Sequence, residues 1–329
     1  MQSLQKKYNA DFVSNSASHP TLTETVQQAV TPTVSVIIPT YNRCHTLARA
    51  IDSVLHQTRP ADEIIVIDDG STDDTAALLE KYNDVICLKQ ANSGVSSARN
   101  NGIARASSSW IAFLDSDDEW LPSKLHEQLS MIEQQPETRI CHTDEIWIRN
   151  GRRVNPARKH TKAGGWIYSM CLPLCAISPS AVMIHHSLFE QHGTFDTDLP
   201  ACEDYDLWLR LCSHWPVTYL ETQLLYKYGG HTDQLSRKYD SMDRFRIRAL
   251  EKILRSNTLD EKNHQATITT LLDKSGVYLK GAIKRGRYDE AEKLLDQLDD
   301  LMPTDSLRTH LSLSLKNHGE VTFQTARRP

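Results

Sequence analysis

The chain has 329 residues, of which 39% are hydrophobic and 24% are charged, a balance typical of a folded globular protein and not of a disordered one. Its formal net charge of −5 does not favour nucleic-acid binding. This length allows one large α/β domain or two smaller ones.

The first residues, 1–32, are polar, rich in Ser, Thr, Gln and Asn, and lack a sustained hydrophobic period, so we expect a flexible leader. A regular alternation of strands and helices follows. Strands are expected at 34–38, 63–67, 85–88 and 110–114, and helices at 46–57, after Asp73, at 94–106 and after Pro122. This order predicts a parallel sheet with helices on both faces, whose ligands lie beyond the carboxyl ends of the strands.

The pattern is less regular over residues 139–185, where short strands are expected at 145–148 and 181–184, before a helix at about 203–213. After Ser236 the sequence shifts to helical stretches, and residues 281–298 resemble one tetratricopeptide-type hairpin. A single hairpin is below the three or so units that a repeat array needs. We therefore predict a leader (1–32), an α/β domain (33–236) and a helical C-terminal extension (237–329).

Cysteine usage and hydropathy bear on the cellular location of the protein. Seven scattered cysteines without a Cys-x-x-Cys pair are typical of reduced thiols in the cytoplasm. No apolar run reaches the roughly 20 residues of a membrane-spanning helix, and no apolar stretch follows Lys6 and Lys7 as in a signal peptide. We expect a cytoplasmic protein without a transmembrane segment, and peripheral membrane association stays open.

A local basic stretch contains Arg149, Arg152, Arg153, Arg158 and Lys159. We interpret it as a solvated loop in preference to a phosphate-binding or membrane-binding patch.

The clearest chemical signal is the set of carboxylates Asp115, Asp117 and Asp118, which directly follows the strand at 110–114. Carboxylates this close repel one another unless a cation lies between them. Mg²⁺ and Mn²⁺ take carboxylate oxygens together with substrate phosphates. By itself the motif is equally consistent with a solvated acidic turn that caps the next helix.

Other candidates follow the remaining strands. Asp69 comes after the strand at 63–67 and can accept hydrogen bonds from a nucleobase or ribose, or cap a helix. Tyr41, two residues after Pro39, offers a ring for stacking on a base. Arg99 is a cation for a phosphate or for the carboxylates, unless it is an ordinary surface arginine.

Two carboxylates, Glu203 and Asp204, begin the helix predicted at 203–213, where the helix dipole favours the ionised form. A general base that deprotonates a hydroxyl must be ionised, although acidic residues at helix starts are common for structural reasons. His231, after the Gly229-Gly230 turn, is a candidate nitrogen ligand of the metal, although a lone histidine is more often structural.

Taken together, these motifs resemble the family 2 inverting glycosyltransferases in order and spacing. The resemblance covers about residues 34–236. The matching blocks are VSVIIPTYNR (34–43), EIIVIDDGSTDDT (63–75), GVSSARNNGIARA (94–106), WIAFLDSDDEW (110–120), EDYDLWLRL (203–211) and GGHTDQLS (229–236). The resemblance implies an α/β fold of the GT-A type, a Rossmann-like nucleotide-diphospho-sugar transferase fold with a helical C-terminal extension.

The resemblance also implies a role for each matching residue. The nucleotide-binding residues would be Pro39, Tyr41, Asp69, Arg99 and Asp115. The metal, Mn²⁺ or Mg²⁺, would be held by Asp117, Asp115 and His231. Asp204 would be the catalytic base, steadied by Glu203. Family members often carry Arg where this chain has Lys227-Tyr228-Gly229-Gly230, so Lys227 is a candidate for the cation of the pyrophosphate site.

The implied activity is a metal-assisted single displacement of the hexosyltransferase type. It moves a sugar from a nucleotide-diphosphate donor, expected to be a UDP-sugar, to a glycan, lipid-linked or protein acceptor during surface glycan or glycoconjugate synthesis. A nucleotidyltransferase would usually have an early Gly-rich phosphate loop, and residues 34–60 contain no glycine. A non-catalytic nucleotide-sugar-binding scaffold acting through the helical C-terminus is disfavoured because every expected carboxylate is present. No nucleic-acid partner is expected, and self-association stays open.

Overall fold

The computed structural model describes residues 31–230 and 239–301, and those from Pro32 onward belong to one compact unit. Its centre is a nine-stranded sheet in the order β3-β2-β1-β4-β8-β6-β9-β5, with β7 paired to β6. Most of the predicted leader and the predicted boundary at residue 236 lie outside the described residues, so this division of the chain stays a prediction.

Strands β1, β2 and β6 extend beyond the predicted bounds, β3 and β8 are shifted by one residue, and β4 ends one residue earlier than predicted. They are β1 (Val34–Thr40), β2 (Glu63–Asp68), β3 (Ile86–Lys89), β4 (Trp110–Phe113), β5 (Glu119–Trp120), β6 (Ile140–Arg149), β7 (Arg152–Val154), β8 (Val182–His185) and β9 (Thr218–Gly229). The predicted parallel pairing is confirmed for β1 to β4. The sheet as a whole is mixed, because β8 pairs antiparallel with β4 and with β6, and β5 pairs antiparallel with β9.

The helices follow the predicted alternation. They are α1 (Cys44–Leu55), α2 (Thr75–Leu79), α3 (Val95–Arg105), α4 (Lys124–Gln134), α5 (Tyr168–Cys171), α6 (Ser187–His192), α7 (Glu203–Cys212), α9 (Asp243–Arg255), α10 (Glu261–Lys284) and α11 (Tyr288–Asp299), with short 3₁₀ turns at Arg158–His160 and Pro179–Ala181. No helix in the described ranges combines the length and the apolar character needed to span a bilayer.

Strand β1 is buried along its whole length because helices cover both faces of the sheet. Alternate residues such as Val36 and Ile38 belong to the hydrophobic cluster that includes α1. Ile37 belongs to the opposite cluster with α3. There Gly102 lies against Ile37, and a Cβ at this position would collide with the Ile37 side chain, so the glycine allows α3 to approach the sheet closely.

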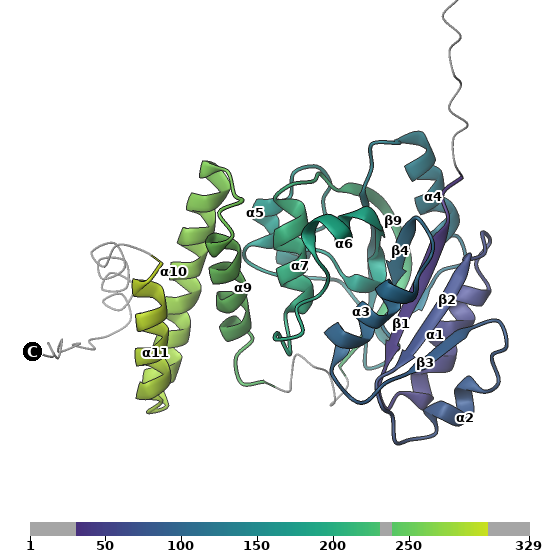
Figure 1. Ribbon diagram of the computed structural model, residues 1–329, viewed down its shortest axis with the longest axis horizontal. Coiled ribbons are helices and arrows are strands. Elements are labelled where there is room, and N and C mark those ends of the chain that lie inside the picture. The colour runs from purple at the N-terminus through teal and green to yellow at the C-terminus, as the bar shows by residue number, and fades with distance from the viewer. Residues whose placement is uncertain (1–30, 231–238, 302–329) are drawn as a thin grey trace, which may run out of the picture. The chain divides into compact units, whose positions relative to one another are not determined.

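The helices after residue 242 continue the same core. Figure 1 shows α9 between α7 and α10, and the contacts between elements agree. Buried residues of α9 and α10, such as Leu250 and Leu271, share one hydrophobic cluster with Trp208 of α7. The predicted helical extension is confirmed over α9 to α11, while residues 237–238 and 302–329 of it lie outside the described residues.

The strand register places three predicted motifs at one edge of the sheet. Thr40 at the end of β1 pairs with Asp68 at the end of β2, and Phe113 at the end of β4 pairs with Ile37 of β1. The residues that follow these strands, among them Tyr41, Asp69 and Asp115, therefore emerge beyond the same carboxyl edge, as is usual for ligand sites in such sheets.

Candidate functional site

A buried arginine joins two of the predicted acidic motifs. Arg99 of α3 donates from Nη1 to Oε1 of Glu203 and from Nη2 to Oδ1 of Asp115, at 2.7 Å in each case. Its side chain is only 4% exposed. The structure thus brings together the turn after β4 and the first residue of α7, two motifs that are far apart in the sequence.

This arrangement fixes a positive charge between two carboxylates. Although burial lowers the pKa of Arg99, Asp115 and Glu203 raise it above its usual value. Burial and the charge of Asp204 raise the pKa of Glu203 to about 7, which the pairing with Arg99 offsets only in part. The sequence offers two roles for Arg99, as a cation for a phosphate or for the carboxylates, and the structure shows the contact with carboxylates.

The acidic turn after β4 is tied to its surroundings through Asp118. This carboxylate is buried and accepts hydrogen bonds from the Ser180 hydroxyl, at 2.6 Å, and from the Tyr228 N–H, at 2.9 Å. Burial, with the charges of Asp117 and Asp115 adding to it, raises the pKa of Asp118 well above its usual value. Asp115 and Asp117 are partly exposed on the same turn, so they are the carboxylates that a ligand can reach.

These residues fit a hard divalent cation. Mg²⁺ binds through one or two protein carboxylates together with substrate phosphates, and Asp115 and Asp117 are two such carboxylates. Burial is the main cause of the raised pKa of Asp118, and the charges of Asp117 and Asp115 raise it further; a cation would relieve this second, repulsive contribution. Among the described residues, no three His, Cys, Asp or Glu side chains form a metal-binding group, and the predicted ligand His231 lies outside them.

The predicted base lies in the first turn of α7. Asp204 is partly exposed, and its Oδ1 accepts a hydrogen bond from the Tyr205 N–H at 2.7 Å. Its Oδ2 accepts one from the Cys175 thiol at 2.9 Å. Burial and the Asp204 charge raise the pKa of Cys175 well above its usual value, so this thiol stays protonated and can donate. Sequence reasoning missed Cys175, since nothing in its spacing marks it.

The residue before α7 has an unusual backbone. Cys202 adopts a left-handed conformation, with φ 62° and ψ 23°, which is uncommon for residues other than Gly, Asn and Asp. Strained residues of this kind cluster at functional sites. Here the conformation sets the direction in which α7 begins at Glu203 and Asp204.

A separate set of contacts surrounds Asp69. Its Oδ1 accepts hydrogen bonds from Gln90 Nε2 (2.7 Å) and the Ser93 N–H (2.9 Å), and its Oδ2 accepts one from the Gly94 N–H (2.8 Å). Asp69 therefore holds the loop that leads into α3. Since a carboxylate has about four acceptor positions, a contact with a nucleobase remains compatible with this role and stays a prediction.

The other predicted nucleotide-binding residues differ in exposure. Pro39 is buried within β1, whereas Tyr41 is 46% exposed at the carboxyl edge. Within the described part of the chain, neither has a hydrogen bond or ion pair to Arg99, Asp115 or Glu203. Of these two residues, only Tyr41 has a ring that a nucleobase can reach.

Beneath the acidic turn lies a network of buried charges. Lys227 of β9 donates to the Ser178 hydroxyl at 2.5 Å, and Lys162 lies 3.4 Å from Glu145 Oε1. Although burial raises the pKa of Glu145, Lys227 and Lys162 hold it at about 2. Burial lowers the pKa of Lys227, but Glu145, Asp118 and Asp115 together raise it. Lys227, the candidate pyrophosphate cation, therefore lies close to the acidic turn.

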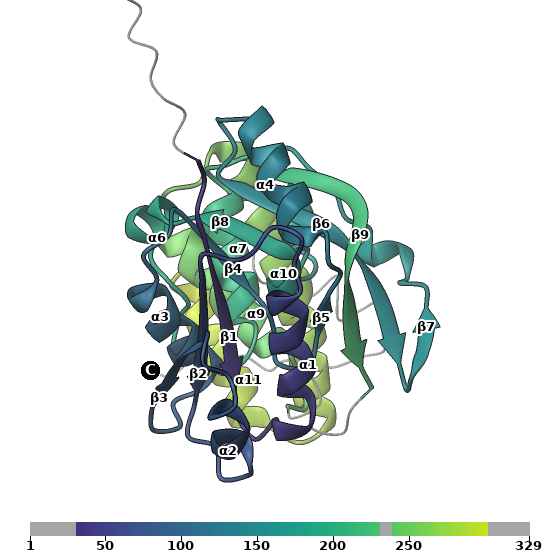
Figure 2. The same ribbon diagram turned by 90° about the vertical axis from the view of Figure 1, so that its right-hand side faces the viewer.

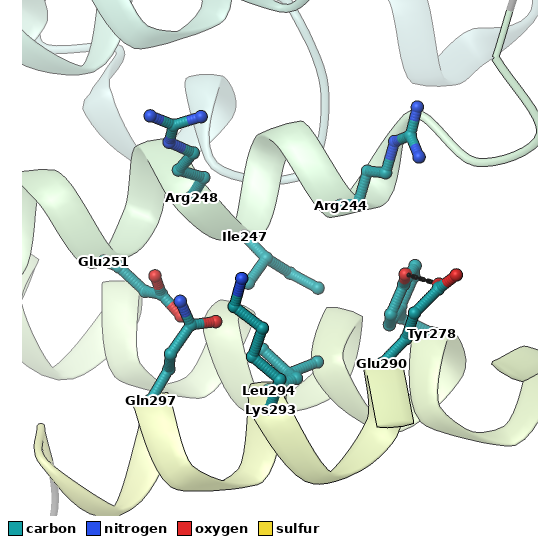
Figure 3. A pocket seen from close by; sticks show the side chains of 9 residues that line it. All are labelled: Arg244, Ile247, Arg248, Glu251, Tyr278, Glu290, Lys293, Leu294 and Gln297. Carbon is teal, nitrogen blue, oxygen red and sulfur yellow. Dashed lines mark hydrogen bonds between the residues drawn. The ribbon is translucent and has the colours of Figure 1, made fainter. Parts of the chain in front are cut away.

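A groove of about 600 Å³ lies elsewhere, between α9, α10 and α11 (Figure 3). Its lining mixes cations and anions, among them Arg248, Lys293 and Glu251, and includes none of the predicted site residues. The candidate site is therefore the carboxyl edge of the sheet, where the acidic turn, Arg99 and the start of α7 meet, and not this groove.

Comparison with known sequences gives matches along most of the chain. Residues 35–173 match the model of glycosyl transferase family 2. The uncharacterized glycosyltransferase RP339 of Rickettsia prowazekii is 30% identical over 311 residues, which cover 89% of this chain and 94% of that protein. The Escherichia coli protein WfgD, a UDP-Glc:alpha-D-GlcNAc-diphosphoundecaprenol beta-1,3-glucosyltransferase, is 34% identical over 184 residues, 54% of this chain and 69% of that protein.

Comparison with solved structures also gives a match over most of the chain. The crystal structure of S. aureus TarS 1–349 in complex with UDP-GlcNAc superposes with a TM-score of 0.69 at 20% sequence identity. The match covers 86% of this chain and 87% of the TarS chain. At this level of identity the likeness concerns the fold.

Proposed function

Because the chain belongs to glycosyl transferase family 2, we propose that it transfers a sugar from a UDP-sugar to an acceptor hydroxyl, with inversion at the anomeric carbon. It is a glycosyltransferase with the predicted GT-A fold. The observation that carries the proposal is the Arg99 bridge, since one guanidinium holds the acidic turn at Asp115 and the helix start at Glu203 in a single cluster.

The donor side of the site is built from the ends of β1, β2 and β4. Tyr41 and Asp69 would contact the nucleoside, while Asp115 and Asp117 would hold a divalent cation, Mn²⁺ or Mg²⁺. When bound, such a cation neutralises charge on the departing diphosphate. The UDP-GlcNAc complex of TarS and the UDP-Glc named as the donor of WfgD support a UDP-sugar.

The acceptor side is built around Asp204. The acceptor oxygen forms the new bond to the anomeric carbon while the bond to the diphosphate oxygen breaks, and the diphosphate keeps that electron pair. Asp204 takes the hydroxyl proton through one of its carboxylate oxygens. Attack from the face opposite the leaving group inverts the anomeric carbon. A sugar on a lipid diphosphate, the acceptor class named for WfgD, is among the acceptors that suit this scheme.

The proposal is tested by nucleotide release from UDP-, GDP- and dTDP-sugars with the purified full chain, each with Mn²⁺, Mg²⁺ or chelator. We expect slow release from a UDP-sugar that needs the cation. We expect Asp117→Ala to lower release by about 100-fold or more, because the charge of the diphosphate is the largest electrostatic demand of the step.

The matched control is Asp144→Ala, a partly exposed carboxylate of β6 outside the acidic turn, which should keep the wild-type rate. If no nucleotide is released, donor binding measured by calorimetry shows whether a suitable acceptor was missing or whether the protein has no donor site. Binding of no nucleotide sugar, with or without the cation, would contradict the proposed transferase activity.

The thiol of Cys175 gives a second prediction at this site. Because its hydrogen bond holds Oδ2 of Asp204, we expect Cys175→Ala to lower kcat by about 5- to 10-fold with little change in the KM for the donor. Cys175→Ser keeps a donor at this position and should recover most of the rate. The measurements are kcat and KM against pH, since a displaced base changes the acid limb of the profile.

A neighbouring buried thiol supplies the control. Cys171 is buried, and within the described residues no hydrogen bond joins it to Asp204, so Cys171→Ala tests for a general packing effect. Equal losses in the two alanine variants, or no rescue by Cys175→Ser, would show that Cys175 does not position the base.

A further inference from the structure

The stretch between Glu145 and Glu190 has an unusual charge pattern. It contains no Asp or Glu, although the chain as a whole carries 42 acidic residues against 37 Lys and Arg. Its cations are Arg149, Arg152, Arg153, Arg158, Lys159 and Lys162. The segment 149–162, which contains all of them and is here called the basic segment, is therefore a positive region on a protein that is negative overall.

Four of these cations are on the surface and are not neutralised. Arg152, Arg153, Arg158 and Lys159 are exposed, and in the described ranges none of them forms an ion pair. Arg153 donates to the amide oxygen of Gln223 at 3.0 Å, a neutral partner. An ordinary solvated surface intersperses both signs of charge, so this group of exposed cations without ion pairs is suited to an anionic partner.

A cluster of aromatic rings lies beside the basic segment. The Trp147 ring lies 5.0 Å from the His160 ring, centroid to centroid, and the Arg149 guanidinium lies 4.8 Å from the Trp147 centroid. Trp147 is partly exposed. A tryptophan beside cations is the combination that favours the polar boundary of a bilayer.

The basic segment is joined to the candidate site through the sheet. Arg149 of β6 pairs with Arg152 of β7 on one side and with Gly229 of β9 on the other. The residue before Gly229 in β9, Tyr228, donates its N–H to Asp118 of the acidic turn at 2.9 Å. Figure 2 shows β7 at the outer margin of the sheet beside β6. A surface that contacts the basic segment thus lies near the site.

We propose that the basic segment docks the enzyme on a bilayer that contains anionic phospholipids, so that the site faces acceptors presented from that membrane. The cations extend along an exposed hairpin and the turn that follows it, which matches a planar array of phosphates. Their field reaches about 8 Å at physiological salt, so the negative remainder of the chain does not cancel it at close range. The link to the acceptor rests on the proposed function, whereas the docking does not.

The test is sedimentation of the full chain with vesicles of phosphatidylcholine, with or without phosphatidylglycerol, at low and high salt. Wild type should bind only the anionic vesicles, and salt should weaken binding. The hairpin variant combines Arg152→Gln, Arg153→Gln, Arg158→Gln and Lys159→Gln. It should bind about 100-fold more weakly or worse, since each cation near an anionic surface strengthens binding by about five-fold.

A scattered variant with the same change in net charge is the control. It combines Lys81→Gln, Arg255→Gln, Lys262→Gln and Lys284→Gln, four exposed cations of other regions. It should bind vesicles like wild type, and both variants should melt at the wild-type temperature and release nucleotide from the donor at the wild-type rate.

Three results would overturn the docking. The first is a hairpin variant that binds anionic vesicles as tightly as wild type does. The second is an equal loss of vesicle binding in the hairpin and scattered variants. The third is a wild-type protein that binds a DNA duplex more tightly than anionic vesicles. Because vesicle binding needs no donor, a failure to turn over any nucleotide sugar would count against the proposed function and not against the docking.

Discussion

The Asp204→Asn enzyme is expected to bind its nucleotide-sugar donor like wild type and to lose sugar transfer by about 10²- to 10⁴-fold. Asparagine has the shape of aspartate and can still accept the Tyr205 N–H hydrogen bond that holds Oδ1. It cannot take the proton of the acceptor hydroxyl, so the loss falls on kcat. The measurements are kcat with a transferring acceptor and the donor Kd by calorimetry.

A control for Asp204 lies a few residues upstream. The Asp198 side chain is 79% exposed, so Asp198→Asn removes a nearby charge without touching the cluster around Arg99. It should keep the wild-type kcat to within about two-fold. If Asp204→Asn retains turnover within a few-fold of wild type, the base is another group.

Arg99→Met is expected to lower the free energy of unfolding by about 3–5 kcal/mol, because it leaves buried carboxylates without their counter-charge. Glu203 is almost fully buried, with a 7% exposed side chain, while Asp115 is 31% exposed. Most of the loss should therefore come from Glu203. Urea unfolding followed by circular dichroism measures it.

The combination of Arg99→Met with Glu203→Gln separates this electrostatic effect from lost packing. Neutralising Glu203 removes the uncompensated charge, so the double variant should regain about 1–3 kcal/mol relative to Arg99→Met alone. Arg105→Met, at an exposed position of the same helix, should change stability by less than about 0.5 kcal/mol. Independent, additive effects of the two substitutions would contradict a stabilising ion pair.

The first half of the fold could be predicted because its signals are local. Buried strands such as Val34–Thr40 are continuous apolar runs, and the helices between them have a clear amphipathic period. Of the long strands, β6 was predicted only over residues 145–148, and β9 only as a strand-like run over Leu224–Tyr228. Their pairing depends on residues such as Cys141 and Thr218, which are distant in sequence, and β9 carries polar residues along much of its length.

The sequence predicted which residues belong to the candidate site, but not how they contact one another. The order of the motifs indicates that Asp115, Glu203 and Arg99 belong to one site, and the structure shows their direct contact. The contact of Cys175 with Asp204 could not be predicted. It depends on the path of the loop after α5, which lacks a repeating pattern, and an unpaired cysteine is most often an ordinary core residue.

The shared core of α7 and α9 affects how sequence variation in the C-terminal helices is to be interpreted. Leu250 and Ile253 of α9 are buried in the same cluster as Trp208 of the helix that carries Asp204. A cavity at either position destabilises the fold by a few kcal/mol, and the cell removes unfolded enzyme by proteolysis. Natural variants in α9 would then alter the cellular abundance of the enzyme, while each surviving molecule keeps its normal turnover.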